Sequence, residues 1–165
     1  MKPDKQFIVS EQLAKHLTEV YFGGNWTTVN LRDTLKDVSC EEALKQIGSL
    51  NSIATIVYHL QYYVQAVTKV LHGEALNSKD ELSFLHPPFQ SENDWNTFLE
   101  NCWKEAEEFT VLIRQLEDQK MWEYFTAEKY GNYFRNLAGI IEHHHYHLGQ
   151  IVIIKKMIRE TSLIN

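Results

Sequence analysis

The sequence is poor in cysteine, and its two cysteines stand far apart. Cys40 and Cys102 form neither a C-x-x-C pair nor a dense disulfide pattern, which excludes a disulfide framework and predicts a protein of a reducing cytoplasm. Either thiol could in principle be a nucleophile. Cys102, however, lies on an apolar helical stripe and is expected to serve as inert packing.

Long apolar runs and basic stripes are also missing. The longest apolar run is stopped by Lys155 and Lys156, so no membrane-spanning helix is expected. Residues 1–6 lead into only a short apolar stretch before Glu11, so no signal peptide is expected. The 22 acidic and 16 basic side chains give a net charge of −6. Nucleic acid and anionic membrane surfaces are therefore poor partners. A small-molecule substrate is expected instead from the open metal site described below.

Strand-like alternation and internal repeats are absent, whereas helical periodicity is strong. The 165 residues suit one domain, residues 1–165. Apolar stripes and capping residues predict four long helices that begin near Ser10, Asn51 or Ser52, Ser91 and Asn132. A capping box at Ser39 predicts a short helix through Leu44 to Ile47. Four amphipathic helices with long first and third connections predict an all-α bundle.

The last predicted helix carries a dense histidine cluster. The segment "IEHHHYHLGQ", residues 141–150, places four histidines in five positions of an apolar repeat. His143 and His147 are four residues apart, so both can face one ion. His144 and His147 form a second pair, three apart, and His144 could replace His143 as a ligand. His145 is expected to look outward.

A third ligand has to come from another helix, and His59 is the candidate because it sits in the middle of the second long helix. Three neutral imidazoles leave a coordination place for water or substrate, which is typical of catalytic metal sites. Zinc or nickel suits such a site best, and iron or manganese would also bind. Glu142 is a candidate hydrogen-bond partner for a ligand.

These histidines also have a purely structural interpretation. A histidine on the flank of an apolar stripe is often a hydrogen-bonded core residue, and a histidine cluster can simply be solvated. The position of the cluster inside the apolar repeat favours the metal site, because an unpaired buried imidazole needs a partner.

Other cofactor chemistries fit the sequence poorly. A di-iron carboxylate site needs two E-x-x-H motifs, but Glu142 and His145 form the single one, and residues 51–73 contain no carboxylate. Ligation of haem by two histidines could use His59, yet no C-x-x-C-H attachment motif is present. The chain also has no glycine-rich phosphate loop before a helix and no G-x-S-x-G.

Three segments carry a family resemblance: "NSIATIVYHLQYY", "KYGNYFRN" and "IIEHHHYHLGQIVIIKK". Together they resemble the DinB-like superfamily, including its bacillithiol-transferase-like branch, over essentially the whole chain. The resemblance implies an up-down-down-up four-helix bundle, a divalent metal held by His59, His143 and His147, and a homodimer. Characterised members of the family include metal-dependent thiol S-transferases and mycothiol-dependent isomerases.

The predicted function is a metal-dependent enzyme that joins a low-molecular-weight thiol to a small electrophile. The polar side chains proposed to contact substrate are Arg135, Tyr58, Tyr62 and Gln150, together with Tyr133 and Asn136. A metal-dependent hydrolase is the first alternative. It is weakened because Glu142, the nearby carboxylate on that helix, points about 100° away from His143. A non-catalytic dimeric protein with a stress-response or binding role is the second alternative.

Overall fold

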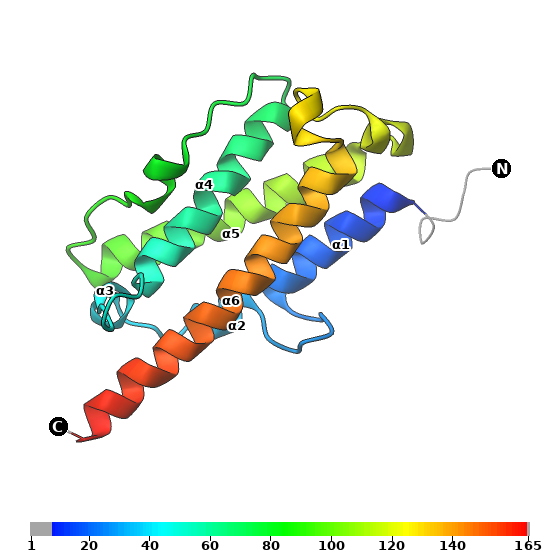
Figure 1. Cartoon of the computed structure of the whole chain (residues 1–165). Coiled ribbons are helices and arrows are strands. Elements are labelled where there is room, and N and C mark those ends of the chain that lie inside the picture. Colours follow the sequence, from blue (N-terminus) through cyan, green and yellow to red (C-terminus); the bar gives the residue numbers. More distant parts are fainter. Residues whose placement is uncertain (1–7, 165) are drawn as a thin grey trace.

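The computed structural model describes residues 8–164, with side chains as far as Thr161, and its regular structure there is helical (Figure 1). The long helices are α1 (Val9–Phe22), α4 (Ile53–Leu71), α5 (Glu92–Gln115) and α6 (Tyr133–Ile164). The short ones are α2 (Leu31–Leu35), α3 (Cys40–Leu44) and the 3₁₀ turns η2 (Asp80–Phe84), η3 (Asp118–Trp122) and η4 (Glu128–Tyr130). The predicted all-α class is confirmed.

Two expectations concern membranes and export. Within the described range, no helix is long and apolar enough to cross a membrane. The expectation that no signal peptide begins the chain falls largely on residues 1–7, which lie outside the described residues.

The predicted caps explain where most helices begin. Ser52 and Ser91 accept hydrogen bonds from the backbone N–H groups of Thr55 and Asp94, and Asn132 accepts one from Arg135. Each of these satisfies one of the free N–H groups of a first helical turn. The capping box at Ser39 is also present, but its helix ends at Leu44 and does not reach Ile47.

The start of α1 differs from the prediction. Ser10 does not cap this helix; it lies inside the first turn and is buried. The cap comes instead from η3, because the Asp118 carboxylate accepts from the backbone N–H groups of Val9, at 3.0 Å, and Ser10, at 3.4 Å. An acidic side chain at this end also complements the helix dipole.

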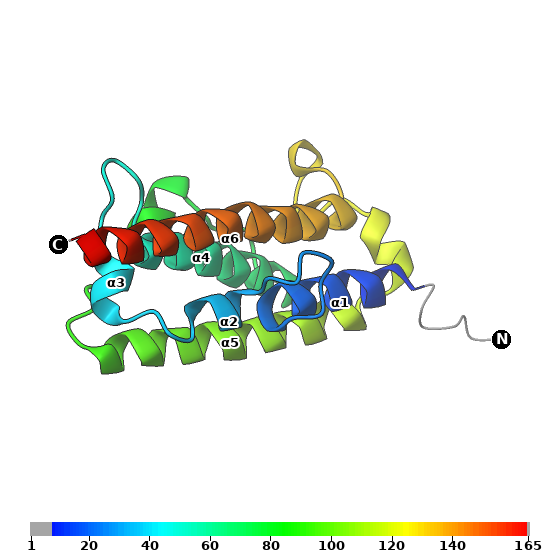
Figure 2. The same ribbon diagram turned by 90° about the horizontal axis from the view of Figure 1, so that it is seen from below.

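The long helices lie roughly along one axis (Figures 1 and 2), with α1 and α6 running in one direction and α4 and α5 in the other. Helix α1 contacts α5 and α6, and α4 contacts the same two helices. Their inner faces form a continuous apolar cluster. The largest fully buried side chains include Trp95, Tyr21, Phe109, Leu17, Leu137, Ile151 and Ile158.

Three short elements, α2, η2 and η4, were not expected from the sequence. Helix α2 begins after Asn30, whose side chain accepts from the Asp33 N–H. The 3₁₀ turn η2 lies in the long connection between α4 and α5 and packs on α4. All three are too short to show apolar periodicity. The turn η2 shapes the site described next.

Candidate metal centre

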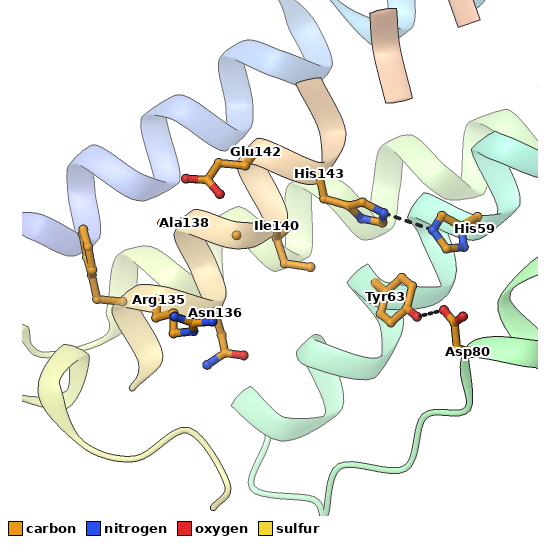
Figure 3. Close-up of a pocket in the computed structure, with 11 residues that line it drawn as sticks. His59, Tyr63, Asp80, Arg135, Asn136, Ala138, Ile140, Glu142 and His143 are labelled. Atoms are coloured by element: carbon orange, nitrogen blue, oxygen red, sulfur yellow. Dashed lines mark hydrogen bonds between the residues drawn. The ribbon is translucent and has the colours of Figure 1, made fainter. Parts of the chain in front are cut away.

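Helices α4 and α6 bring three of the predicted residues together. His59 lies in the middle of α4, and His143 and His147 lie one turn apart on α6. One ligand nitrogen from each lies within 4.8 Å of the other two. The Nε2 atoms of His59 and His143 are 3.0 Å apart (Figure 3). Two nitrogens bound to one ion at about 2.1 Å would lie about 3.0–3.4 Å apart, so the three histidines could hold a metal ion.

A hydrogen-bond chain fixes the proton of His59. The Ser83 hydroxyl donates to the backbone oxygen of Asp80 at 2.6 Å. Its oxygen therefore accepts from the Nδ1–H of His59, at 2.7 Å. Because a neutral imidazole carries one N–H, the Nε2 atom of His59 keeps its lone pair and faces His143. The ring of Phe84 stacks on His59 with centroids 4.2 Å apart, so η2 sets both the tautomer and the orientation of this imidazole.

Gln150 does the same for His147. The Nδ1–H of His147 donates to the amide oxygen Oε1 of Gln150 at 2.6 Å. An amide oxygen only accepts, so the Nε2 atom of His147 is the nitrogen left free to bind a metal. Gln150, which the sequence predicted as a substrate contact, thus orients the candidate metal ligand His147 in this structure.

The charge state of the three imidazoles also suits a metal. Burial is the main cause that lowers the pKa of His59 and His147. Burial, followed by the neighbouring His147 and His59, lowers the pKa of His143 to about 4. All three rings are therefore neutral near pH 7. Neutral rings can bind a metal without releasing a proton to solvent. His143 donates its Nε2–H to Nε2 of His59 at 3.0 Å, so this proton would have to move to Nδ1 when a metal binds.

His144 has a different role. It is fully buried, its Nδ1–H donates to the backbone oxygen of Ile140 at 2.7 Å, and its Nε2 accepts from the Tyr21 hydroxyl at 2.7 Å. Both nitrogens are used by the protein, so His144 is a core residue facing α1. His143 is the one that faces His59. His145 is half-buried and lines a separate hollow beside His16.

A cavity of about 660 Å³ opens beside His59 and His143. Its wall comes from α4, η2 and the first half of α6, and its polar side chains are Tyr63, Asp80, Arg135, Asn136 and Glu142. The Tyr63 hydroxyl donates to Asp80 Oδ1 at 2.5 Å (Figure 3). Burial and this hydrogen bond raise the pKa of Tyr63 to about 12. The phenol therefore stays protonated and ties η2 to α4.

Known proteins add nothing to this picture. Family models, curated proteins and solved structures give no match to the chain. The DinB-like resemblance therefore stays a prediction, and the interpretation of the centre rests on its residues and their geometry.

The predicted substrate contacts fall in different places. Arg135 lines the cavity, as does Asn136. Tyr58 packs near the rings of His86 and Phe98. The Tyr62 hydroxyl accepts from the backbone N–H of Lys79 at 2.7 Å. The substrate contacts of all these residues remain predictions. Of the four main candidates, Arg135, Tyr58, Tyr62 and Gln150, Arg135 is the one that lines the cavity.

Other residues of the site escaped the sequence analysis, and one predicted partnership is not formed. Tyr63 follows His59 by four residues, a spacing that could have placed it on the same helical face. Asp80 and Ser83 belong to η2, where no periodic pattern marks them. Glu142 lines the cavity, but within residues 8–161 its carboxylate makes no hydrogen bond with the three histidines.

Proposed function

We propose that this protein is a metal-dependent thiol S-transferase of the DinB-like type, with His59, His143 and His147 as the metal ligands. The observation that carries the proposal is the orientation of two of these imidazoles. Ser83 and Gln150 accept hydrogen bonds from the Nδ1–H groups of His59 and His147, which leaves the Nε2 lone pairs of both rings for a metal. The cavity beside them gives a small substrate access. The opposed helix directions (Figure 1) also support an up-down-down-up four-helix bundle.

Zinc or nickel is the expected metal, since both accept imidazole ligands, and iron or manganese would fit the same donors. A bound divalent cation would lower the pKa of a thiol and so keep a low-molecular-weight thiol as its nucleophilic thiolate near neutral pH. The cosubstrate in this proposal is such a thiol, and the acceptor is a small electrophile.

The residues of this chain would act by positioning. Ser83 and Phe84 hold the His59 ring, and Gln150 holds that of His147. Preset ligand orientation lowers the reorganisation needed when the centre forms. Tyr63 and Asp80 form one wall of the substrate space. Because Tyr63 keeps its proton bound to Asp80, we assign this phenol a structural role and not that of a proton donor.

A metal-dependent hydrolase is a second candidate, and one observation favours it. Asp80 places a carboxylate on the same cavity. Its Oδ1 accepts from Tyr63, and among residues 8–161 its other oxygen accepts no side-chain hydrogen bond. A carboxylate within reach of a water molecule is what a general base requires. The sequence had shown Glu142 as the nearby carboxylate of the last helix, so Asp80 strengthens this alternative.

The test compares the two reactions on one preparation. Full-length protein loaded with zinc or nickel is mixed with bacillithiol or glutathione and the electrophile monochlorobimane, and conjugate formation is followed by fluorescence. We expect metal-dependent conjugation that is lost in His143→Ala. Hydrolysis of an activated ester without any thiol, lost in Asp80→Asn, would favour the hydrolase. Activity no higher than that of metal-free protein in both assays would contradict an enzymatic role.

A further inference from the structure

Four residues of α6 follow one another at intervals of four: Arg135, Gly139, His143 and His147. Residues four apart lie on the same side of a helix. Arg135, Gly139 and His143 all line the 660 Å³ cavity, and Figure 3 shows Arg135 and His143 at the two ends of this part of α6. The cavity therefore extends along α6 from the histidines, over Gly139, to Arg135.

Gly139 keeps this path open. A glycine inside a helix costs about 1 kcal/mol relative to alanine. No packing within the described chain requires it, because a Cβ built on Gly139 would meet nothing within 4 Å. The same atom would project over the cavity between Arg135 and His143. The position therefore leaves the cavity wall between Arg135 and His143 open to a ligand.

A second glycine positions the arginine. Gly131 has φ +73, and a Cβ there would lie 2.7 Å from Cδ of Arg135. The missing Cβ leaves room for the stem of Arg135 just before α6 begins. Any side chain at Gly131 would displace that stem, and Gly139 leaves the space between Arg135 and the histidines unfilled.

Among residues 8–161, the guanidinium groups of Arg135 and Arg32 form no ion pair with a carboxylate, and that of Arg32 lies over the Phe22 ring at 4.9 Å. Arg114 pairs with Glu11 at 3.1 Å, and Arg159 pairs with Glu42 at 2.8 Å. Arg135 lines a cavity instead. The planar guanidinium fork matches a carboxylate through two parallel hydrogen bonds. Asp80 and Glu142 on the same cavity would repel a doubly charged group such as a phosphate more strongly than a single carboxylate.

We propose that the thiol bound at this centre is a mercaptocarboxylate, with its carboxylate on Arg135 and its sulfur end at His59, His143 and His147. The inference rests on the proposed function and deepens it by naming the substrate class. The eight residue-to-residue steps from Arg135 to His143 span about 12 Å of helix. The stem of Arg135 runs back toward Gly131, away from His143, so the ligand has to span at least this distance as an extended chain.

The experiment uses full-length protein loaded with cobalt, whose absorption reports a bound thiolate. The probes are ω-mercaptoalkanoic acids of increasing chain length, matched by ω-mercaptoalcohols and ω-mercaptoalkylphosphonates of the same lengths. We expect the acids to bind about tenfold or more tightly than the alcohols at one optimal length, as a charge-assisted hydrogen bond predicts. The preference should disappear in Arg135→Ala and weaken in Arg135→Lys.

Two further variants test the path and the specificity of the charge. Gly139→Leu fills the middle of the path, so it should weaken the longer acids while cobalt stoichiometry and helical content stay unchanged. Lys129→Ala is the matched control, because Lys129 is a nearby cation that lies over the Tyr130 ring. That variant should keep the full preference for acids.

The outcomes separate this inference from the proposed function. A thiolate band with equal affinity for acids and alcohols, or a preference that survives Arg135→Ala, overturns the mercaptocarboxylate assignment and leaves thiol binding intact. Tighter binding of the phosphonates overturns it as well. A cobalt-loaded protein that shows no thiolate band with any probe overturns the proposed thiol chemistry, and this inference with it.

Discussion

The clearest single perturbation of the candidate centre is Ser83→Ala. Ser83 is fully buried, and its hydroxyl joins His59 Nδ1, at 2.7 Å, to the backbone oxygen of Asp80, at 2.6 Å. Removing one oxygen atom frees the His59 ring to take the other tautomer or to rotate. It leaves the ligand nitrogens themselves, and the other two histidines, untouched.

We expect Ser83→Ala to lower both the metal affinity and the free energy of unfolding, and each is measured separately. Partners that orient a ligand histidine typically change metal affinity by about 10–100-fold, which corresponds to about 1.4–2.8 kcal/mol of binding free energy. The variant also leaves the buried Nδ1–H donor of His59 without its partner, so the free energy of unfolding of the metal-free protein should fall by about 1–3 kcal/mol. Competition with a chelator of known affinity gives the first value, and urea denaturation gives the second.

Tyr63→Phe is the matched control for this variant. It removes the other side-chain hydrogen bond that η2 makes beside the centre, between the Tyr63 hydroxyl and Asp80, and it keeps the aromatic ring near His59. We expect a loss of stability without a comparable loss of metal affinity. Wild-type metal affinity in Ser83→Ala, or equal losses of affinity in both variants, would refute the assigned role of Ser83.

Three further predictions concern α6. Burial lowers the pKa of His144 to about 3, so below its ordinary value near 6.5 the unfolded chain binds a proton that the folded one does not. Its contribution should reduce the free energy of unfolding as the pH falls from 6.5 toward 3, by up to about 1.4 kcal/mol per pH unit. Urea titrations at several pH values that give a flat profile between 6.5 and 4.5 would contradict this. Gln150→Leu removes the acceptor of the His147 N–H and should lower metal affinity about tenfold or more in the chelator assay, whereas unchanged affinity would exclude that role. Gly149→Ala should raise the free energy of unfolding by about 1 kcal/mol, since its Cβ would meet nothing within 4 Å; a lower melting temperature would argue against it.

Local signals explain which parts of the fold could be predicted from the sequence. Apolar periodicity and the caps at Ser52, Ser91 and Asn132 act within a few residues, so the long helices they begin were predicted closely. The cap of α1 was wrongly assigned because its acceptor, Asp118, is more than a hundred residues away in the chain. No local pattern could reveal that partner.

The residues of the candidate site also divide into those with a local sequence signal and those without one. The spacing of His143 and His147, and the place of His59 within a helix, are local features, and the structure brings these three together. The choice between His143 and His144 was open in the sequence because they are neighbours on the same helix. In the folded chain the His144 ring bonds Tyr21 of α1 in the core, and His143 is the neighbour that faces His59. Ser83 and Asp80 come from an irregular connection, so only the folded chain shows that they belong to the site.

The most direct test of the central claim is the metal content of four variants. Full-length wild-type protein, His59→Ala, His143→Ala, His147→Ala and the control His145→Ala are dialysed against zinc or nickel, and bound metal is measured by mass spectrometry alongside helical content by circular dichroism. Three converging imidazoles predict about one ion per chain in the wild type and in His145→Ala, and a clear loss in each of the other three with the helices retained. One tightly bound ion per chain in His59→Ala would contradict a centre shared between α4 and α6.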